Sequence, residues 1–335
     1  MIDIKNKIKE YLTKKDTKFN SIFEINKMSG GSSNEIWIIK YLDNNTENKI
    51  VFRRHYSGIS EKENLYPPLS LSIESEVMAE AYKQKIPVPK IIYNVDKDHE
   101  LGESFFMEFI DGITLGNKIV ENRSVKLLKP NLASQCGEIL AKIHSIPYQN
   151  IKDLNSSTGI DEIKKYKDIY QDYSFNIPVF NLSFKWLEKN IPPVTNKCLV
   201  HGDYRNGNIV ISPSKGIKSI LDWELLHLGD RHEDLAWICV NSWRFGNIKL
   251  PVGGFGLRND FYKAYEQSSG EKLNKESLKF WEILGTLKWG IMCLKMYDAY
   301  KSGYDRSVDR AAIGRRSSET EIDLLRLLNN EDRYE

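Results

Sequence analysis

The side chains best suited to chemistry stand in two short polar stretches of the second half of the chain. Residues 201–208 read HGDYRNGN between two apolar runs, and residues 222–224 read DWE after a third. A tight turn between strands can bring the carboxylate of Asp203, the amide oxygen of Asn208 and the carboxylate of Asp222 to one point. Hard cations such as magnesium take oxygen ligands of this kind and usually keep a phosphate as co-ligand. The pattern therefore predicts a magnesium site that serves a phosphate substrate.

This arrangement resembles the catalytic core of the aminoglycoside phosphotransferase family, the small-molecule branch of the protein-kinase-like fold. That family has HGDxxxxN followed by a short DxE-type element, and both parts stand here in order. The resemblance implies that Asp203 accepts the proton of the substrate hydroxyl, while Asn208 and Asp222 hold magnesium. It also implies ATP as the phosphoryl donor and a small-molecule hydroxyl as the acceptor.

A glycine- and serine-rich turn lies upstream, between the first two predicted strands. It consists of Gly30, Gly31, Ser32, Ser33 and Asn34, and the phosphate loop of the family occupies this place. Glycines let backbone amides approach phosphate oxygens, and hydroxyl groups donate further hydrogen bonds. A plain hairpin turn is the alternative that the sequence leaves open.

The third predicted strand, residues 49–53, is expected to carry a cation. Alternation along a strand places Val51 and Arg53 on one face. The resemblance implies that Val51 covers the adenine and that Arg53 binds the phosphates, where the family usually has lysine. Arginine keeps its charge and binds phosphate through two nitrogens, so the role is retained. Lys49 is the alternative phosphate contact.

A glutamate on the next helix is expected to pair with this cation. The helix is predicted over 73–85 and ends before Pro87, because proline lacks an amide hydrogen and disfavours helix in the preceding residue. Glu74 is the expected partner, since its spacing to Pro87 fits the family, and Glu76 is the alternative. Either could instead be a solvated acid in the first turn, favoured by the helix dipole.

The predicted organisation is α+β, a protein-kinase-like fold of two lobes that share one cleft. A β-rich nucleotide-binding lobe is expected over 1–110, a hinge at about 107–112, and a mainly helical catalytic and acceptor-binding lobe over 113–335. The resemblance implies that the backbone of Glu108, Phe109 and Ile110 binds the adenine edge. Strands are expected at 23–28, 35–41, 49–53, 90–93, 104–110, 197–200, 208–211 and 219–222, and helices at 2–12, 73–85, 131–146, 258–267, 278–300 and 319–328.

The segment 228–237 resembles the G-D-x-x-x-D-L-A element of the family. Asp234 is therefore expected to brace the catalytic loop, and His201 is expected to do the same rather than carry a proton. His144 is expected in the core. Trp243, Trp281 and Trp289 are expected to be packing residues.

The amino-acid composition of the chain argues against several classes of protein. The chain has 335 residues, of which 41% are hydrophobic and 28% charged, and its 48 Lys and Arg nearly balance 46 Asp and Glu. A formal net charge of +2 argues against a dedicated nucleic-acid binder. No apolar run approaches the roughly 20 residues of a membrane helix, and the N-terminus lacks an apolar signal core, so a cytoplasmic protein is expected. The 4 cysteines are expected to be buried free thiols.

Several alternatives stay open within this reading. A protein kinase is disfavoured because no long activation segment with A-P-E follows Asp222. A catalytically weak pseudokinase would find its support in the arginine at position 53. The overall order also resembles the phosphotransferase domain joined to some acyl-CoA dehydrogenases, whose bacterial relatives phosphorylate hydroxyacyl-CoA. An anionic acceptor of that kind could meet one of the arginines at positions 231, 244, 258, 315 and 316, unless those of the tail pair with Glu319 and Glu321. The oligomeric state is not predicted.

Overall fold

The computed structural model describes residues 2–28, 34–55, 69–149, 151–173, 175–193 and 196–331. Its contacts divide the chain into two compact units. The first unit consists of Met1–Gly112, Pro147–Leu154 and Lys218–Leu226, and the second of Ile113–Ile146, Asn155–Ile217 and His227–Glu335. The segment with Asp222 and Glu224 thus belongs to the same unit as the N-terminal strands.

The first unit is built on an antiparallel sheet with the strand order β1-β2-β3-β5-β4. Helix α1 and the short helix η1 pack their apolar side chains against Trp37, Ile39 and Phe52 on one face of this sheet. Helix α2 follows β3 and carries Glu74, which contacts Arg53 of β3. The elements are α1 (Ile2–Lys15), η1 (Thr17–Ser21), β1 (Ile22–Lys27), β2 (Asn34–Asp43), β3 (Thr46–His55), α2 (Leu71–Lys83), β4 (Ile91–Val95) and β5 (Ser104–Glu108).

The hairpin between β2 and β3 is tighter than the sequence suggested. The strands predicted at 35–41 and 49–53 leave residues 42–48 between them, but only Asn44 and Asn45 lie between β2 and β3. Both have left-handed backbone conformations, with φ of 49° and 62°. Asparagine tolerates this region, and a two-residue turn of this kind matches the right-handed twist of the paired strands. The register that follows sets Arg53 opposite Ile36 on one side and Phe105 on the other.

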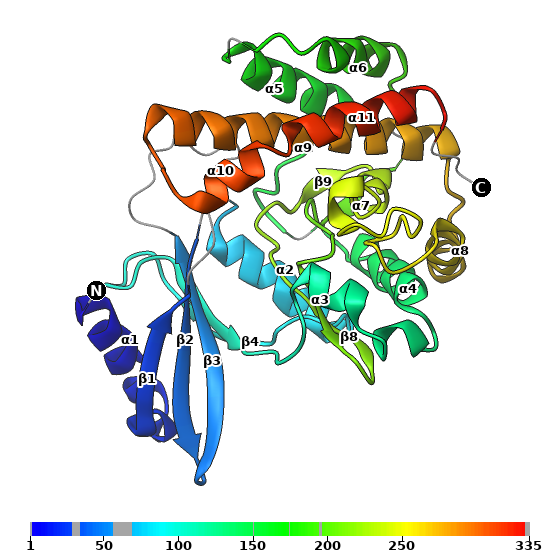
Figure 1. The fold of residues 1–335 in the computed structure, drawn as a ribbon. Coiled ribbons are helices and arrows are strands. Elements are labelled where there is room, and N and C mark those ends of the chain that lie inside the picture. The colour runs from blue at the N-terminus through cyan, green and yellow to red at the C-terminus, as the bar shows by residue number, and fades with distance from the viewer. Residues whose placement is uncertain are drawn as a thin grey trace. The chain divides into compact units, whose positions relative to one another are not determined.

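The second unit is mainly helical, with α9 as its longest element. Helices α7, α10 and α11 pack on α9, and α5 and α6 contact it as well (Figure 1). Strand β6 pairs with β9. The helices are α3 (Gly116–Glu121), η2 (Val125–Leu127), α4 (Leu132–His144), α5 (Gly159–Gln171), α6 (Pro178–Lys189), α7 (His232–Trp237), η3 (Asn241–Trp243), α8 (Arg258–Ser269), α9 (Lys275–Ser302), α10 (Val308–Gly314) and α11 (Ser317–Leu328), and the strands are β6 (Cys198–Val200), β7 (Ile209–Ser212) and β9 (His227–Gly229). Strand β8 (Gly216–Ile220) begins in the second unit, and its residues from Lys218 onward belong to the first.

The predicted α+β class is confirmed, with a sheet in the first unit and helices in the second. Helices α4, α8, α9 and α11 lie where apolar periodicity placed them, whereas α3, α5, α6 and α10 were not predicted. Helix α5 begins with a capping box in which Thr158 and Asp161 bond each other's backbone, and α6 has Pro178 in its first turn. Both are start signals that the sequence contains.

All four cysteines are buried and outside disulfides, as expected. Within the described ranges, the structure contains no helix with the length and hydropathy that crossing a bilayer requires.

Candidate active site

Arg53 is the centre of a charged cluster in the first unit. Its Nη1 lies 3.5 Å from Oε1 of Glu74 on α2, and its Nη2 lies 3.0 Å from Oδ1 of Asp222 and 2.9 Å from Oε2 of Glu224. The side chain of Arg53 is only 5% exposed. Asn34, the first residue of β2, donates from Nδ2 to Oε2 of Glu224 at 2.6 Å. One buried guanidinium therefore holds three carboxylates together.

Burial sets the electrostatics of this cluster. It raises the pKa of Glu74 to about 7, with a further contribution from Asp222, although Arg53 opposes the rise. Burial also disfavours the charged guanidinium, but Glu74, Asp222 and Glu224 outweigh it and raise the pKa of Arg53 above its usual value. Arg53 therefore stays charged, while Glu74 is close to exchanging a proton near neutral pH.

The other candidate residues for nucleotide binding near the first strands lie in different surroundings. Val51 is buried next to Phe52 in β3 and pairs with Met107 of β5. The alternative phosphate contact, Lys49, lies 3.7 Å from Glu47 rather than in the Arg53 cluster. Glu76 is exposed, whereas Glu74 is 1% exposed and contacts Arg53. Gly30, Gly31, Ser32 and Ser33 lie outside the described residues.

The predicted hinge follows β5. Glu108 is the last residue of that strand, its side chain is exposed, and its N–H donates to the carbonyl of Lys90 at 2.9 Å. Phe109 and Ile110 come after the strand and are half-buried. Their part in binding adenine stays a prediction.

Asp203 is held in the second unit by three side-chain donors. Its Oδ1 accepts hydrogen bonds from Nε of Arg205 at 2.9 Å and from the indole Nε1 of Trp237 at 2.7 Å. Its Oδ2 accepts from Nδ2 of Asn208 at 2.6 Å. The same amide nitrogen donates to the main-chain oxygen of Asp203 at 3.0 Å. The carboxylate side chain is 14% exposed, so it is both oriented and accessible.

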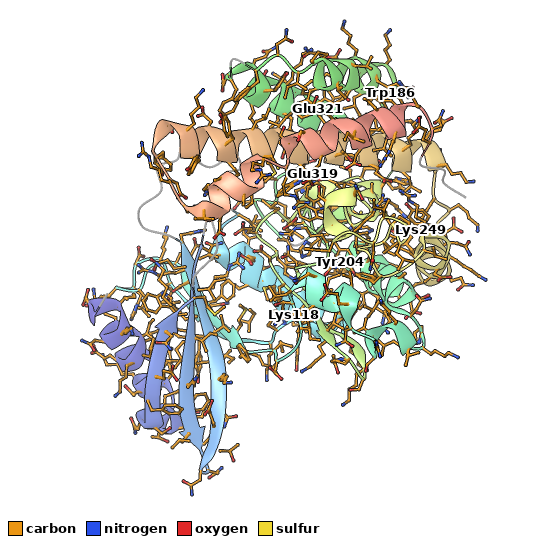
Figure 2. All side chains as sticks on the ribbon, viewed as in Figure 1. Lys118, Trp186, Tyr204, Lys249, Glu319 and Glu321 are labelled. Carbon is orange, nitrogen blue, oxygen red and sulfur yellow. The ribbon has the colours of Figure 1, made fainter. Side chains whose placement is uncertain are left out.

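Asp234 braces the loop that carries Asp203, as the sequence predicted. It accepts from the backbone N–H groups of His201 and Gly202 at 2.7 and 2.9 Å, and its Oδ2 lies 3.1 Å from Nε2 of His144. Burial disfavours its ionised form, but the contacts with His144 and His201 hold the pKa of Asp234 below its usual value. Tyr204, labelled in Figure 2, is fully buried and donates to the carbonyl of Cys136 on α4 at 3.1 Å.

Both predicted metal ligands offer oxygen. The amide nitrogen of Asn208 is engaged by Asp203, which leaves the amide oxygen as its cation-binding atom. Asp222 has a left-handed φ of 68°, and its side chain is 36% exposed. Asn208 and Asp222 belong to different units, and within the described ranges no three His, Cys, Asp or Glu side chains are grouped to hold a metal. An amide and a carboxylate oxygen fit magnesium rather than zinc.

The arginines that were candidates for an anionic acceptor are largely neutralised within the protein. Arg244 and Arg258 lie 3.2 and 2.7 Å from Oε1 of the buried Glu282, with side chains 2% and 7% exposed. The guanidinium groups of these two arginines are therefore already paired with a buried acid. Arg231 lies 3.4 Å from Glu271. Arg316 pairs with Glu319, labelled on α11 in Figure 2, as the alternative for the tail expected.

Two neighbours of Asp203 were missed by sequence reasoning. Arg205 stands two positions after Asp203, and this spacing alone could have suggested a contact. Trp237 was noted only as the end of a motif, and nothing in the local sequence indicates that its indole reaches a carboxylate 34 positions earlier. The same holds for Glu224 and Asn34, which are 190 positions apart.

Comparison with known proteins agrees with this picture. The sequence model of the Phosphotransferase enzyme family matches residues 24–269. Mouse acyl-CoA dehydrogenase family member 10 is 26% identical over 236 residues, which are 65% of this chain and 20% of that protein. A probable aminoglycoside 3'-phosphotransferase of Lactococcus lactis is 24% identical over 62% of this chain and 77% of its own length. The chain thus spans about a fifth of the mouse relative.

The fold has matches among solved structures. A protein from Ralstonia eutropha assigned to the aminoglycoside phosphotransferases superposes with a TM-score of 0.72 at 18% identity, covering 97% of this chain and 98% of its own. The fold is thus the protein-kinase-like fold of small-molecule phosphotransferases.

Proposed function

Because the chain belongs to the phosphotransferase enzyme family, we propose that it is an ATP- and magnesium-dependent kinase of a small molecule with a hydroxyl group. In this reaction the acceptor oxygen forms a bond to the γ-phosphorus of ATP, and the bond from that phosphorus to the bridging oxygen breaks. ADP leaves, and the proton of the acceptor hydroxyl passes to Asp203. Such transfers depend mainly on positioning and on charge neutralisation.

The observation that carries this proposal is the state of Asp203. A catalytic base must offer a carboxylate oxygen in a fixed direction, and Asp203 is held by Arg205, Trp237 and Asn208 while remaining partly exposed. Asp234 fixes the backbone of the same loop through His201 and Gly202. An ordinary polar turn has no need of such an arrangement. The intact set also argues against a pseudokinase.

We assign nucleotide binding to residues of the first unit. Arg53 would bind the phosphates, Glu74 would orient Arg53, Val51 would cover the adenine, and the backbone of residues 108–110 would meet its edge. The turn formed by Gly30, Gly31, Ser32, Ser33 and Asn34 would close on the phosphates. Arg53 now contacts Asp222 and Glu224, so it must give up at least part of these contacts when phosphate binds.

Magnesium would be held by Asn208 and Asp222 together with phosphate oxygens. The ion would neutralise charge on the transferred phosphoryl group. The carboxylate of Asp222 suits the role of metal ligand because its side chain is 36% exposed and offers the oxygen ligands that magnesium prefers. Asn34 donates to Glu224, the other acid that contacts Nη2 of Arg53. In functional terms, residues 1–110 would form the nucleotide lobe and residues 113–335 the catalytic and acceptor lobe.

The proposal is tested by a transfer screen. The protein is incubated with magnesium and γ-labelled ATP or GTP and with aminoglycosides, macrolides, amino alcohols, sugars or hydroxyacyl-CoA esters, and labelled product is measured. Transfer to one class that requires magnesium supports the proposal. ATP binding without transfer to any of these acceptors or to water would contradict it and favour a nucleotide-binding scaffold.

Hydroxyacyl-CoA esters are a second, more specific candidate for the acceptor. The likeness to an acyl-CoA dehydrogenase family member over 65% of this chain favours them. The pairing of Arg244 and Arg258 with Glu282 removes two cations that such an acceptor could have used. Arg231, Arg315 and Arg316 remain as contacts for its anionic groups. Faster transfer to these esters than to amino alcohols and aminoglycosides would decide for this candidate.

A further inference from the structure

Trp237 makes a polar contact that core packing does not require. It is the last residue of α7, its side chain is buried, and its indole N–H donates to Oδ1 of Asp203 at 2.7 Å. It shares a core cluster with Trp243 and Trp289, and its ring centroid lies 5.3 Å from that of Trp243. The polar edge of one ring in this cluster is thus directed at the proposed catalytic base.

The other two indoles of the cluster behave differently. Trp243 and Trp289 are 5% and 9% exposed, and among the described residues neither indole nitrogen has a hydrogen-bond partner. Their rings lie 4.7 Å apart and serve packing. All three indoles supply apolar area, but within the described residues only Trp237 of these three donates a hydrogen bond to a carboxylate.

We propose that Trp237 is a positioning residue that selects which oxygen of Asp203 receives the proton, an inference that rests on the proposed function. A carboxylate oxygen accepts two hydrogen bonds well. Both positions on Oδ1 are taken, by Trp237 and Arg205. Oδ2 has one bond, from Asn208, and keeps one position. The acceptor hydroxyl therefore meets Oδ2.

Lys288 lies over the ring of Trp237 and strengthens the hydrogen bond that the indole N–H donates. Its Nζ lies 4.9 Å from the ring centroid of Trp237 and 4.0 Å from Oε1 of Glu233, and its side chain is buried. A cation over an aromatic face is attracted to the π electrons. Drawing those electrons toward Lys288 makes the indole N–H a better donor. The contact thus links Lys288 on α9 through Trp237 to Asp203.

Fixing the plane of the carboxylate matters because proton transfer depends on direction. A misplacement of about 1 Å in a reacting group can cost on the order of a hundredfold in rate. Without Trp237, Oδ1 keeps Arg205 alone and gains an open position, while Asn208 still holds Oδ2. The acceptor hydroxyl can then meet either oxygen, and the single direction of proton transfer is lost. Nucleotide binding does not use this contact and is expected to be unchanged.

The kinetic test compares Trp237→Phe with Trp289→Phe, which removes an indole of the same cluster that lacks this contact. The assay is magnesium-dependent ATP hydrolysis, in which water replaces the acceptor alcohol. For Trp237→Phe we expect kcat to fall about ten- to hundredfold, as for a lost hydrogen bond to a charged group, with KM for ATP within about twofold. Trp289→Phe is expected to stay within about threefold of wild type. Equal kcat in the two variants would overturn the positioning role.

A spectroscopic test needs neither turnover nor an acceptor. With ¹⁵N-labelled tryptophan, the indole N–H signal of Trp237, identified by its loss in Trp237→Phe or in the conservative Trp237→His, should move upfield in Asp203→Ala. The signal of Trp289 should stay in place. A Trp237 signal that ignores Asp203→Ala would exclude the contact, even if the Trp237 variants fold poorly for kinetics.

The proposed function can fail separately from this inference. If Asp203→Asn hydrolyses ATP at the wild-type rate, or if the wild type transfers phosphate neither to water nor to any acceptor of the screen, the assigned base is wrong and the positioning role falls with it. If Asp203→Asn is inactive while Trp237→Phe matches Trp289→Phe, only the role of Trp237 is refuted.

Discussion

The clusters around Arg53 and Asp203 have opposite arrangements of charge. Arg53 is one buried cation among three carboxylates, whereas Asp203 is one carboxylate among three donors. The first arrangement carries an excess of negative charge and must exchange partners before its arginine can bind phosphate. The second already has the orientation that a base needs. If the proposed roles hold, the difference teaches that the Arg53 cluster must change its contacts when nucleotide binds, whereas Asp203 is already fixed.

The largest effect on the rate of phosphate transfer should come from a change at Asp203. Asp203→Asn removes the proton acceptor but keeps the shape of the side chain, so transfer should fall by about a thousandfold. Nucleotide affinity should change little, because Arg53 and its partners are untouched. Rates with the best acceptor of the screen and calorimetric ATP binding measure the two effects. A transfer rate of Asp203→Asn near the wild-type level would show that Asp203 is not the base. The contrast between the two clusters would then lose its functional meaning.

Arg53→Met tests the Arg53 cluster by its effect on the free energy of unfolding. It leaves Glu74 buried without its cation, which should lower the free energy of unfolding by about 3–5 kcal/mol at pH 8. The matched control is Arg54→Met, one position along β3. Arg54 pairs with Glu35 at 2.7 Å, but Glu35 keeps Lys27 at 2.6 Å. Urea unfolding of both variants is the measurement. Equal losses of unfolding free energy would show that Arg53 does not stabilise the buried Glu74 as proposed.

The pH dependence of stability should follow Glu74. Burial raises its pKa from 4.5 to about 7, so the folded state binds this proton more tightly than the unfolded state. The contribution of this group to stability is then fully present below pH about 4.5 and is lost as the pH rises through about 7, a decline of about 3 kcal/mol at most. Urea unfolding at pH 5 and pH 8 should show a smaller decline in Glu74→Gln than in wild type. The same decline of unfolding free energy in Glu74→Gln as in wild type would contradict the assignment of this pH dependence to Glu74.

The smallest effect separates the two acids that face the same nitrogen of Arg53. Asp222→Ala should weaken magnesium-dependent ATP binding by at least about tenfold, since it removes the proposed metal ligand. Glu224→Gln is the control, because it keeps the hydrogen-bonding shape and is not assigned to the metal. Magnesium titrations of ATP affinity in both variants give the comparison. A normal titration for Asp222→Ala would remove Asp222 from the metal site.

The sequence predicted most of what local pattern can encode. The strand that carries Arg53 and the helix that carries Glu74 follow from alternation and proline positions, and the HGDxxxxN spacing identified Asp203 and Asn208. The tight turn at Asn44 and Asn45 was read as a longer loop, since polar residues dominate on both sides. Helices α5 and α6 were missed although the sequence contains their start signals, the capping box at Thr158 and Pro178 in the first turn of α6.

The contacts that could not be predicted are those made by distant segments. Neither the indole of Trp237 at Asp203 nor the amide of Asn34 at Glu224 has a signature in its own neighbourhood. They arise from tertiary packing, which a single sequence does not display.

The first unit takes Lys218–Leu226 from the middle of the chain, and this has a consequence for biosynthesis. On the ribosome the N-terminal sheet emerges first, but the acids at 222 and 224 that surround Arg53 leave the exit tunnel only after most of the intervening helices have been made. Until then the guanidinium has Glu74 alone as its ion-pair partner in this cluster. The N-terminal segment must therefore wait, incompletely assembled, for a late piece of chain, and a fragment that ends at Gly112 would lack the counter-charges that complete it.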